Sequence, residues 1–209
     1  MVRRLIYIKT MTLNGFRLIP GALDEAAQTV LVRAVAAAAE VAPFHQPMTP
    51  FGKRMSVGQT SFGPLGWTSD ASGYRYADRH PATGERWPAM PPVLLDLWDR
   101  YAGADRPPDS CLVNHYGPGA KMGLHLDQDE TDLDVPVLSI SLGDTAIFRL
   151  GGPRRGDPTR TVRLASGDVC VLGGAARRAY HGVDRVLSGS SRLIAGGGRL
   201  NLTLRRAAA

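Results

Sequence analysis

The sequence predicts a mainly β protein of the α+β class, a sandwich or jelly roll with helices packed on one face. The 209 residues are 44% hydrophobic and 21% charged, which suits one globular domain with a full core. Helical patterns occur in the first half of the chain, and short strand patterns separated by glycine-rich turns fill the second half. Helices that are separated from the strands along the chain usually pack on one face of the β core.

The first half of the chain contains two expected helices. Residues 21–41 form the first, because alanine dominates the segment and apolar residues recur at helical spacing. Residues 44–66 are rich in Pro, Gly, Thr and Ser and are expected to form strands and turns, and residues 67–90 a long irregular segment. The second helix is expected to start at Pro92 and to run through Tyr101, since proline suits the first turn of a helix.

The second half of the chain is expected to consist of short strands. Apolar runs of four to seven residues are bounded by Gly-Asp, Gly-Gly and Gly-Gly-Gly turns. About eight strands at this spacing are typical of a sandwich or a jelly roll. The expected strands are residues 111–116, 137–142, 146–150, 161–164, 169–172, 180–183, 192–194 and 199–205.

The chain is basic, with a net charge of +6 and an isoelectric point of about 9.7 that comes mainly from arginine. A basic surface attracts polyanions, and arginine pairs with phosphate in a bidentate manner, so nucleic acid is a natural partner. An arginine-rich composition of the source genome explains the charge equally well. The acidic residues Glu130, Asp132 and Asp134 are expected to form a solvated loop, and the basic residues between 149 and 206 are expected to face phosphate.

The two cysteines, Cys111 and Cys170, lie in separate apolar segments. This pattern excludes a disulfide scaffold and favours a reducing cytoplasm. Residues 1–10 contain too few apolar residues for a signal peptide, and we expect them to be a dispensable extension, with Met11 as a second candidate start. No apolar stretch is long enough to span a membrane. We therefore expect a cytoplasmic monomer.

Two histidines and one aspartate form the strongest candidate site. His125 and Asp127 make a His-x-Asp pair, and His181 follows 54 positions after Asp127. If the first segment is extended, residues two apart point the same way, so both side chains face one pocket. Two imidazoles and a carboxylate suit Fe(II) with positions left open for substrate and oxygen, although zinc accepts the same ligands. The His-x-Asp pair alone is a weak motif, and a structural histidine is the alternative.

The C-terminal strand carries a second candidate site. Arg199, Asn201, Thr203 and Arg205 share one parity, and the intervening leucines share the other. If the polar face is interior, its arginines need an anion, because a buried unpaired charge is costly. A small dicarboxylate beside the metal fits, with one end on the metal and the other in a guanidinium fork. The alternative is a solvent-facing polar edge.

The motifs together closely resemble those of the AlkB family of Fe(II)/2-oxoglutarate-dependent nucleic-acid dealkylases. The core of the resemblance is Asn-His-Tyr-Gly-Pro-Gly-Ala-Lys-Met-Gly-Leu-His-Leu-Asp-Gln-Asp-Glu at residues 114–130. The resemblance spans residues 44–205, and such ordered agreement of several motifs is specific. The other matching runs are residues 66–68, 73–76, 87–91, 139–143, 151–158, 167–169, 180–182 and 199–205. Three positions depart from the bacterial members of the family. This chain has His115 where they have arginine, Gly123 where they have serine, and Leu172 where they have tryptophan.

The resemblance implies one dioxygenase domain over residues 1–209 with the fold of a double-stranded β-helix. Residues 1–43 are then an N-terminal extension and helix, residues 44–90 a nucleotide-recognition lid, and residues 91–209 a helix and the β-helix core. The resemblance implies 2-oxoglutarate and O2 as co-substrates, and Fe(II) held by the catalytic residues His125, Asp127 and His181. It places five residues around 2-oxoglutarate and leaves open which arginine takes which carboxylate: Asn114, Tyr116, Arg199, Asn201 and Arg205.

The activity implied by the resemblance is oxidative demethylation of N1-methyladenine and N3-methylcytosine in DNA, preferably single-stranded, as direct DNA repair. The alternative is the same chemistry on RNA or a small molecule; a non-catalytic binding module and a zinc hydrolase are weaker rivals. A methylated base reaches the iron only from a single strand or after flipping out of a duplex.

The resemblance also suggests substrate contacts. Trp67 and Tyr74 are candidates for stacking on the base, with His125 on its other face, and core packing is their alternative role. Asp129 is a candidate acceptor for the exocyclic amine of the base. Candidate phosphate or sugar contacts are Tyr76 and Arg155.

Overall fold

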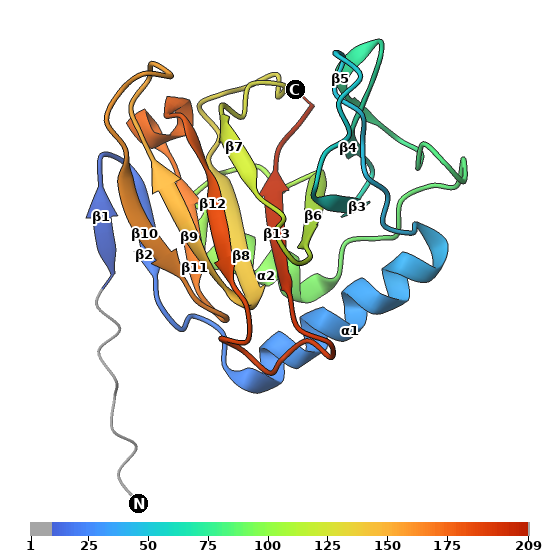
Figure 1. Cartoon of the computed structure of the whole chain (residues 1–209), viewed down its shortest axis with the longest axis horizontal. Helices are drawn as coiled ribbons and strands as arrows, with labels where there is room; N and C mark the ends of the chain where they lie inside the picture. The colour runs from blue at the N-terminus through green and yellow to red at the C-terminus, as the bar shows by residue number, and fades with distance from the viewer. Residues whose placement is uncertain (1–9, 209) are drawn as a thin grey trace, which may run out of the picture.

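Two facing β-sheets, a separate two-stranded hairpin and two α-helices form the protein in a computed structural model that describes residues 10–208 (Figure 1). The larger sheet has the strand order β1-β2-β11-β8-β13-β6-β3, and the smaller has the order β10-β9-β12-β7. Neighbouring strands pair antiparallel throughout both sheets. This architecture is the double-stranded β-helix that the motifs predict. The expected extension over residues 1–10 lies almost wholly outside the described residues.

Both expected helices are present, as α1 (Glu25–Val41) and α2 (Pro92–Tyr101). Asp24 caps α1 by accepting a hydrogen bond of 2.9 Å from the amide of Ala27, and proline occupies the first turn of α2. The strands are β1 Met11–Leu13, β2 Phe16–Ile19, β3 Gly58–Phe62, β4 Gly66–Asp70, β5 Gly73–Ala77, β6 Ser110–Tyr116, β7 Met122–His125, β8 Val137–Gly143, β9 Thr145–Leu150, β10 Arg160–Leu164, β11 Val169–Leu172, β12 His181–Leu187 and β13 Arg199–Arg205, and the 3-10 helix is η1 Gly174–Arg178.

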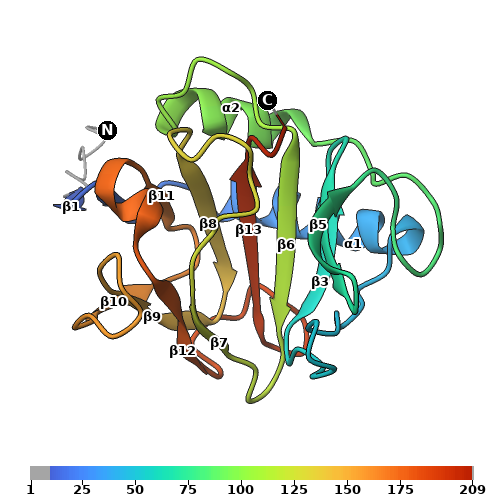
Figure 2. The same cartoon turned by 90° about the horizontal axis from the view of Figure 1, so that it is seen from above.

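The helices cover the outer face of the larger sheet, as the pattern of helices before strands predicts (Figure 2). Leu31 of α1 and Leu94 of α2 are fully buried in one core with residues of β6, β8 and β13. A second core fills the space between the sheets, where Phe16 stacks on Phe148 with ring centroids 5.9 Å apart. Leu172 is buried in this second core. Burial of such side chains stabilises the fold by roughly 1.5–3 kcal/mol each.

β13 lies in the middle of the larger sheet, between β6 and β8. Its three leucines point outward into the core beneath the helices, and its polar side chains point inward, toward the smaller sheet. The alternation of the sequence therefore predicted correctly which side chains of β13 lie on each face. Because the polar face is interior, the alternative of a solvent-facing polar edge is wrong. The predicted anion-binding side chains therefore lie on a central strand that is buried along most of its length.

Three segments differ from the sequence prediction. The expected strand at residues 192–194 is wrong, because the amide of Gly197 bonds to the carbonyl of Ile194 and forms a turn. Residues 67–90 are not irregular throughout, since β4 and β5 form a hairpin there. The short strands β1 and β2 lie at the edge of the larger sheet, where β2 pairs with β11. Each of these segments is short or interrupted by glycine, so its periodicity is weak.

The described helices are too short or too polar for membrane crossing, so none of them is a candidate span.

Candidate metal centre and adjoining cavity

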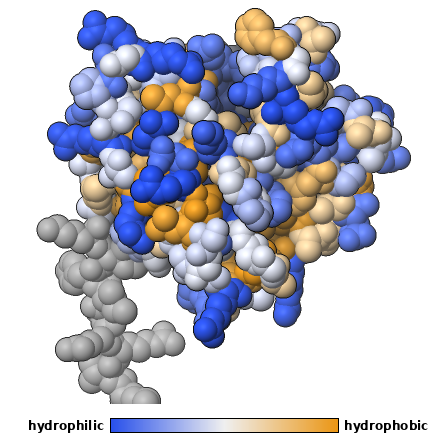
Figure 3. Space-filling view, in the orientation of Figure 1, coloured by the Kyte–Doolittle hydropathy of each residue, from blue (hydrophilic) through white to orange (hydrophobic). Residues whose placement is uncertain are grey.

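A cavity of about 340 Å³ opens between the two sheets, on the side where the β4–β5 hairpin stands. Its walls come from β6, β8 and β13 of the larger sheet and from β7, β9 and β12 of the smaller. Hydrophilic side chains lie along the upper left edge of this face in Figure 3, where the 151–159 loop projects. The cavity joins the predicted metal site to the predicted anion site.

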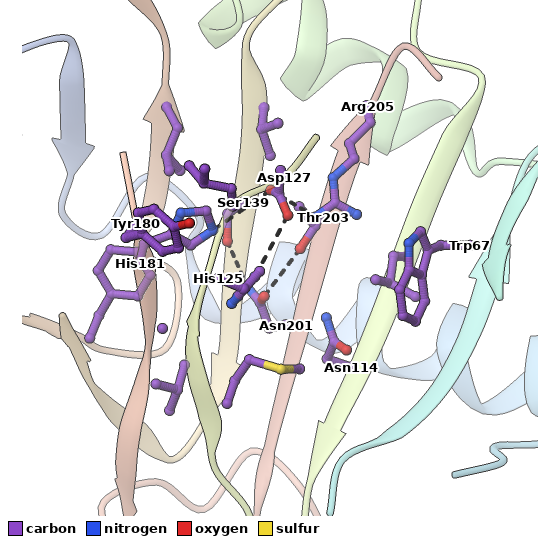
Figure 4. Close-up of a pocket in the computed structure, with 18 of the residues that line it drawn as sticks. Trp67, Asn114, His125, Asp127, Ser139, Tyr180, His181, Asn201, Thr203 and Arg205 are labelled. Carbon is purple, nitrogen blue, oxygen red and sulfur yellow. Dashed lines mark hydrogen bonds and ion pairs between the residues drawn. The ribbon is translucent and has the colours of Figure 1, made fainter. Parts of the chain in front are cut away.

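The triad of His125, Asp127 and His181 is assembled in the cavity (Figure 4). His125 ends β7 and His181 begins β12, and the two are directly paired across the strands. Asp127 reaches the site from the loop after β7 (the 126–136 loop), not from the strand itself. One ligand atom from each residue lies within 4.8 Å of the other two. Such a set can hold one metal ion.

The histidines present their metal-binding nitrogens to the centre of the triad. The Nδ1 atom of His125 lies 2.9 Å from the carbonyl of Gly123, and that of His181 lies 3.0 Å from the carbonyl of Ala179. A carbonyl only accepts, so each Nδ1 carries the proton and each Nε2 keeps a free lone pair. The Nε2 atoms lie 3.6 and 3.7 Å from the Asp127 carboxylate. Carbonyl acceptors on the far nitrogen are the usual support of metal-bound histidine.

The protonation states of the triad suit a metal ion. Burial, together with the neighbouring His125, lowers the pKa of His181 to about 4, so its ring is neutral near pH 7. Burial alone would raise the pKa of Asp127, but Arg205 and the two histidines outweigh it and hold that pKa well below the usual range. Neutral imidazoles and an ionised carboxylate are the forms that bind metal.

The two arginines of β13 have different surroundings. Arg205 lies beside the triad, with its Nη2 atom 2.9 Å from the Asp127 carboxylate. Arg199 is 1% exposed and contacts only neutral oxygens, the hydroxyl of Ser141 at 2.8 Å and two backbone carbonyls at 3.3 Å. Its Nε has no hydrogen-bond partner, and within residues 10–208 it has no ion-pair partner. The carboxylate of Asp168 acts on Arg199 only from beyond ion-pair distance. A buried cation with no anion in direct contact is costly, so an anion fits beside Arg199.

The remaining predicted 2-oxoglutarate residues line the same cavity. Asn201 donates hydrogen bonds to the Ser139 hydroxyl at 2.7 Å and to the Ile140 carbonyl at 3.0 Å, which fixes its amide. Asn114 accepts a hydrogen bond of 2.8 Å from the amide of Gln59. Burial raises the pKa of Tyr116 to about 12, so its hydroxyl stays a neutral donor. This part of the cavity therefore offers polar groups held in fixed orientations within a largely apolar lining, which suits a dicarboxylate.

Comparison with known proteins identifies the family. A model of the 2OG-Fe(II) oxygenase superfamily matches residues 15–205. The chain is 65% identical over 193 residues to an alpha-ketoglutarate-dependent dioxygenase AlkB homolog of Caulobacter vibrioides, covering 92% of this chain and 88% of that protein. It is 45% identical over 181 residues to AlkB of Escherichia coli K12, covering 85% and 83%. The chain belongs to the AlkB family. A solved structure of OsALKBH1 matches with a TM-score of 0.79 and 30% identity, over 95% of this chain and 100% of that one.

As an AlkB-family dioxygenase, the enzyme uses Fe(II), 2-oxoglutarate and O2. The residues present fit these groups, because the triad offers two imidazoles and a carboxylate, and Arg199 offers a buried cation without a partner. This finding removes the non-catalytic module and the zinc hydrolase as alternatives.

The β4–β5 hairpin brings aromatic side chains to the mouth of the cavity of this AlkB-family enzyme. The rings of Trp67 and Tyr74 are stacked, with centroids 5.5 Å apart and planes 20° apart. Trp67 Nε1 donates a hydrogen bond of 2.7 Å to Asp129, which also lines the cavity. Tyr74 is 45% exposed, so core packing does not explain its position. The structure thus brings two aromatic rings and a carboxylate together beside the metal triad.

Two further predicted substrate residues lie at different distances from the cavity. Arg155 lines it, with its guanidinium 5.8 Å from the ring centroid of Tyr180. The hydroxyl of Tyr76 instead donates a hydrogen bond of 2.5 Å to Glu130, and burial raises its pKa well above the usual value. The predicted phosphate or sugar contact of Tyr76 therefore stays a prediction.

The expectation that Glu130 belongs to a solvated loop is wrong. Glu130 is 7% exposed and pairs with Arg177 at 2.9 Å and Arg205 at 3.2 Å. Asp134, in contrast, is solvated, with 84% of its side chain exposed. Sequence reasoning missed Glu130 and Arg177 because their pairing joins positions 47 apart inside an acidic and a basic run, where each charge looks like a surface residue. No local signal in the sequence distinguishes them.

Proposed function

We propose that this enzyme removes methyl groups from N1-methyladenine and N3-methylcytosine in DNA, preferably single-stranded, as direct repair of alkylation damage. The observation that supports this proposal most is the mouth of the cavity. There, the stacked pair Trp67 and Tyr74 and the carboxylate of Asp129 adjoin the metal triad. Flat aromatic faces bind bases, and a carboxylate favours the cationic forms that methylation at these positions creates.

His125, Asp127 and His181 would hold the iron through two Nε2 atoms and one carboxylate oxygen. The bound iron would supply the oxidation of a methyl C–H bond by O2, with 2-oxoglutarate converted to succinate and carbon dioxide. One oxygen atom would end in succinate and the other in a hydroxymethyl group on the base, which would be lost as formaldehyde. The protein's own contribution is orientation and electrostatics. The Nδ1–carbonyl contacts keep both imidazoles in the ligating tautomer.

The surroundings of the two arginines support an assignment of the 2-oxoglutarate carboxylates. Arg205 lies beside the triad and would face the carboxylate nearest the metal. Arg199, buried and without a direct ion-pair partner among the described residues, would bind the distal carboxylate with the hydroxyl of Tyr116 nearby in the same pocket. Arg199 then gains the ion-pair partner that it otherwise lacks.

The base would enter between the β4–β5 hairpin and the triad. Stacking on an aromatic ring contributes roughly 1–3 kcal/mol per base. Trp67 is already oriented by its hydrogen bond to Asp129, so little side-chain freedom is lost on binding. The second carboxylate oxygen of Asp129 can accept a hydrogen bond from the exocyclic amine. A single strand delivers such a base without the cost of opening a duplex, which supports the strand preference.

The same site is compatible with a methylated base in RNA, and this is the second candidate substrate. The cavity wall includes Arg155 at its edge, which suits the phosphate of either nucleic acid.

The proposal is tested by incubating the purified enzyme with Fe(II), 2-oxoglutarate and a single-stranded DNA oligonucleotide that carries one N1-methyladenine. Parallel reactions use the matching duplex and the matching RNA. We expect loss of one methyl mass and one succinate per base repaired, fastest on the DNA single strand. Faster repair of the RNA would favour the second candidate. Demethylation of neither polymer by an enzyme that still converts free 2-oxoglutarate to succinate would reject a nucleic-acid substrate.

A further inference from the structure

Arg177 occupies an unusual position for an arginine. It lies on the short helix η1, four residues before His181, and is 2% exposed. Its side chain enters the 126–136 loop and donates three hydrogen bonds there. The acceptors are the Val135 carbonyl at 3.0 Å, the Asp127 carbonyl at 2.5 Å and the Glu130 carboxylate at 2.9 Å. All three nitrogens of the guanidinium are therefore used within one loop.

These contacts connect the two segments that carry metal ligands. The 126–136 loop carries Asp127, and the segment that contains Arg177 runs directly into His181 through Ala179, whose carbonyl holds the His181 ring. The carbonyl that Arg177 binds belongs to Asp127 itself. A guanidinium is planar and rigid, so three simultaneous contacts fix distance and angle together.

Glu130 extends this connection to the lid. It pairs with Arg177 and with Arg205, and it accepts a hydrogen bond from the hydroxyl of Tyr76 on β5. Arg177 by itself is enough to give Glu130 a buried counter-charge. Arg205 can therefore turn toward an anionic co-substrate, and the Glu130 carboxylate still keeps one ion-pair partner. The β4–β5 hairpin, which carries Trp67, is thereby attached to the loop that carries Asp127.

We propose that Arg177 is a positioning residue that sets the spacing between Asp127 and His181 and so determines metal affinity. The role does not depend on which substrate the enzyme repairs, since it concerns the metal centre alone. Residues that support metal ligands from behind typically change metal affinity by roughly 10–100-fold when they are replaced. A purely structural arginine would stabilise the fold and leave the affinity of the folded protein for metal unchanged.

The test measures metal binding directly, using Co(II) as the probe. Metal-free wild type, Arg177→Met and Arg177→Lys are titrated with Co(II) and followed by visible absorption and by calorimetry, and circular dichroism confirms that each variant is folded. The matched control is Arg178→Met, because Arg178 is the next residue, is about half exposed and pairs only with the solvated Asp134. We expect Co(II) affinity to fall by about 10-fold or more in Arg177→Met, less in Arg177→Lys, and to be unchanged in Arg178→Met.

Wild-type Co(II) affinity in folded Arg177→Met or folded Arg177→Lys would overturn the proposal and leave Arg177 a structural residue. If both variants fail to fold, Glu130→Gln keeps Arg177 and removes the charge that orients it, along with the charge that pairs with Arg205. In that variant we expect weaker Co(II) binding as well, and unchanged affinity would again overturn the proposal. A variant that binds Co(II) with an unaltered spectrum but has lost demethylation would have a defect in the proposed reaction on nucleic acid, and not at the metal centre.

Discussion

The two walls of the cavity are built in different ways. The wall on the larger sheet is β13, a regular strand between two neighbours, whose alternation places Arg199, Asn201 and Arg205 inside. The opposite wall combines the end of β7, the 126–136 loop and the start of β12. In the first wall, hydrogen bonding within the sheet sets each position. In the second wall, side-chain contacts such as those of Arg177 set the positions of the residues. A single substitution there can therefore displace a metal ligand.

The largest effect on turnover is expected in the wall that contains the 126–136 loop. Asp127→Ala removes the only carboxylate ligand of the triad, so we expect turnover to fall below detection and metal affinity to drop strongly. Succinate formation and Co(II) titration measure the two effects. Asp132→Ala is the matched control, because Asp132 lies in the same loop and pairs with Arg106 at the surface. Normal turnover by Asp127→Ala would show that Asp127 is not a metal ligand.

The next largest effect compares the two arginines of β13, in the wall on the larger sheet. Arg199→Met should weaken 2-oxoglutarate binding by roughly 2–5 kcal/mol, because a buried charge pair is lost, and leave Co(II) affinity nearly unchanged. Arg205→Met should weaken both, since Arg205 also pairs with Asp127. Calorimetry with Co(II)-loaded protein under argon separates the two constants. Equal effects of both variants on metal affinity would contradict the separate roles of the two arginines.

A smaller effect is expected at the mouth of the cavity, outside both walls. Trp67→Ala should raise the KM for a methylated oligonucleotide by the equivalent of roughly 1–3 kcal/mol of lost stacking. The affinity for 2-oxoglutarate should not change, because Trp67 lies on the β4–β5 hairpin and not among the predicted 2-oxoglutarate residues. Trp67→Phe keeps the ring but loses the hydrogen bond to Asp129, so it should recover part of the loss. A changed 2-oxoglutarate affinity in either variant would show that the lid and the anion pocket are not independent.

The smallest effect concerns His45, which lies away from both walls. Burial, together with the nearby His80, lowers the pKa of His45 from 6.5 to about 4. Folding therefore favours the neutral ring, so the stability that His45 contributes is present above pH 6.5 and is lost as the pH falls toward 4. Urea unfolding at pH 7.5 and 5 should show a smaller loss of stability for His45→Phe than for wild type. An equal loss would mean that His45 does not titrate differently on folding.

The sequence could predict what depends on regular periodicity. The two helices, the alternation of β13 and the meeting of His125 and His181 at one site all follow from local patterns or from the family motifs. The burial of Glu130 and its pairing with Arg177 could not be predicted, because contact between two charged runs depends on how the 126–136 loop closes over η1. The β4–β5 hairpin was hidden by its short strands and by Gly73 at its turn, which has a φ of 116°.

The central claim is that one cavity joins the metal triad to an anion pocket with separate roles for its two arginines. A crystal structure with Mn(II) and 2-oxoglutarate tests it most directly. We expect anomalous density for the metal between His125 Nε2, His181 Nε2 and the Asp127 carboxylate, with the distal carboxylate of 2-oxoglutarate on Arg199. A metal bound elsewhere, or a distal carboxylate on Arg205 with Arg199 left unpaired, would contradict it.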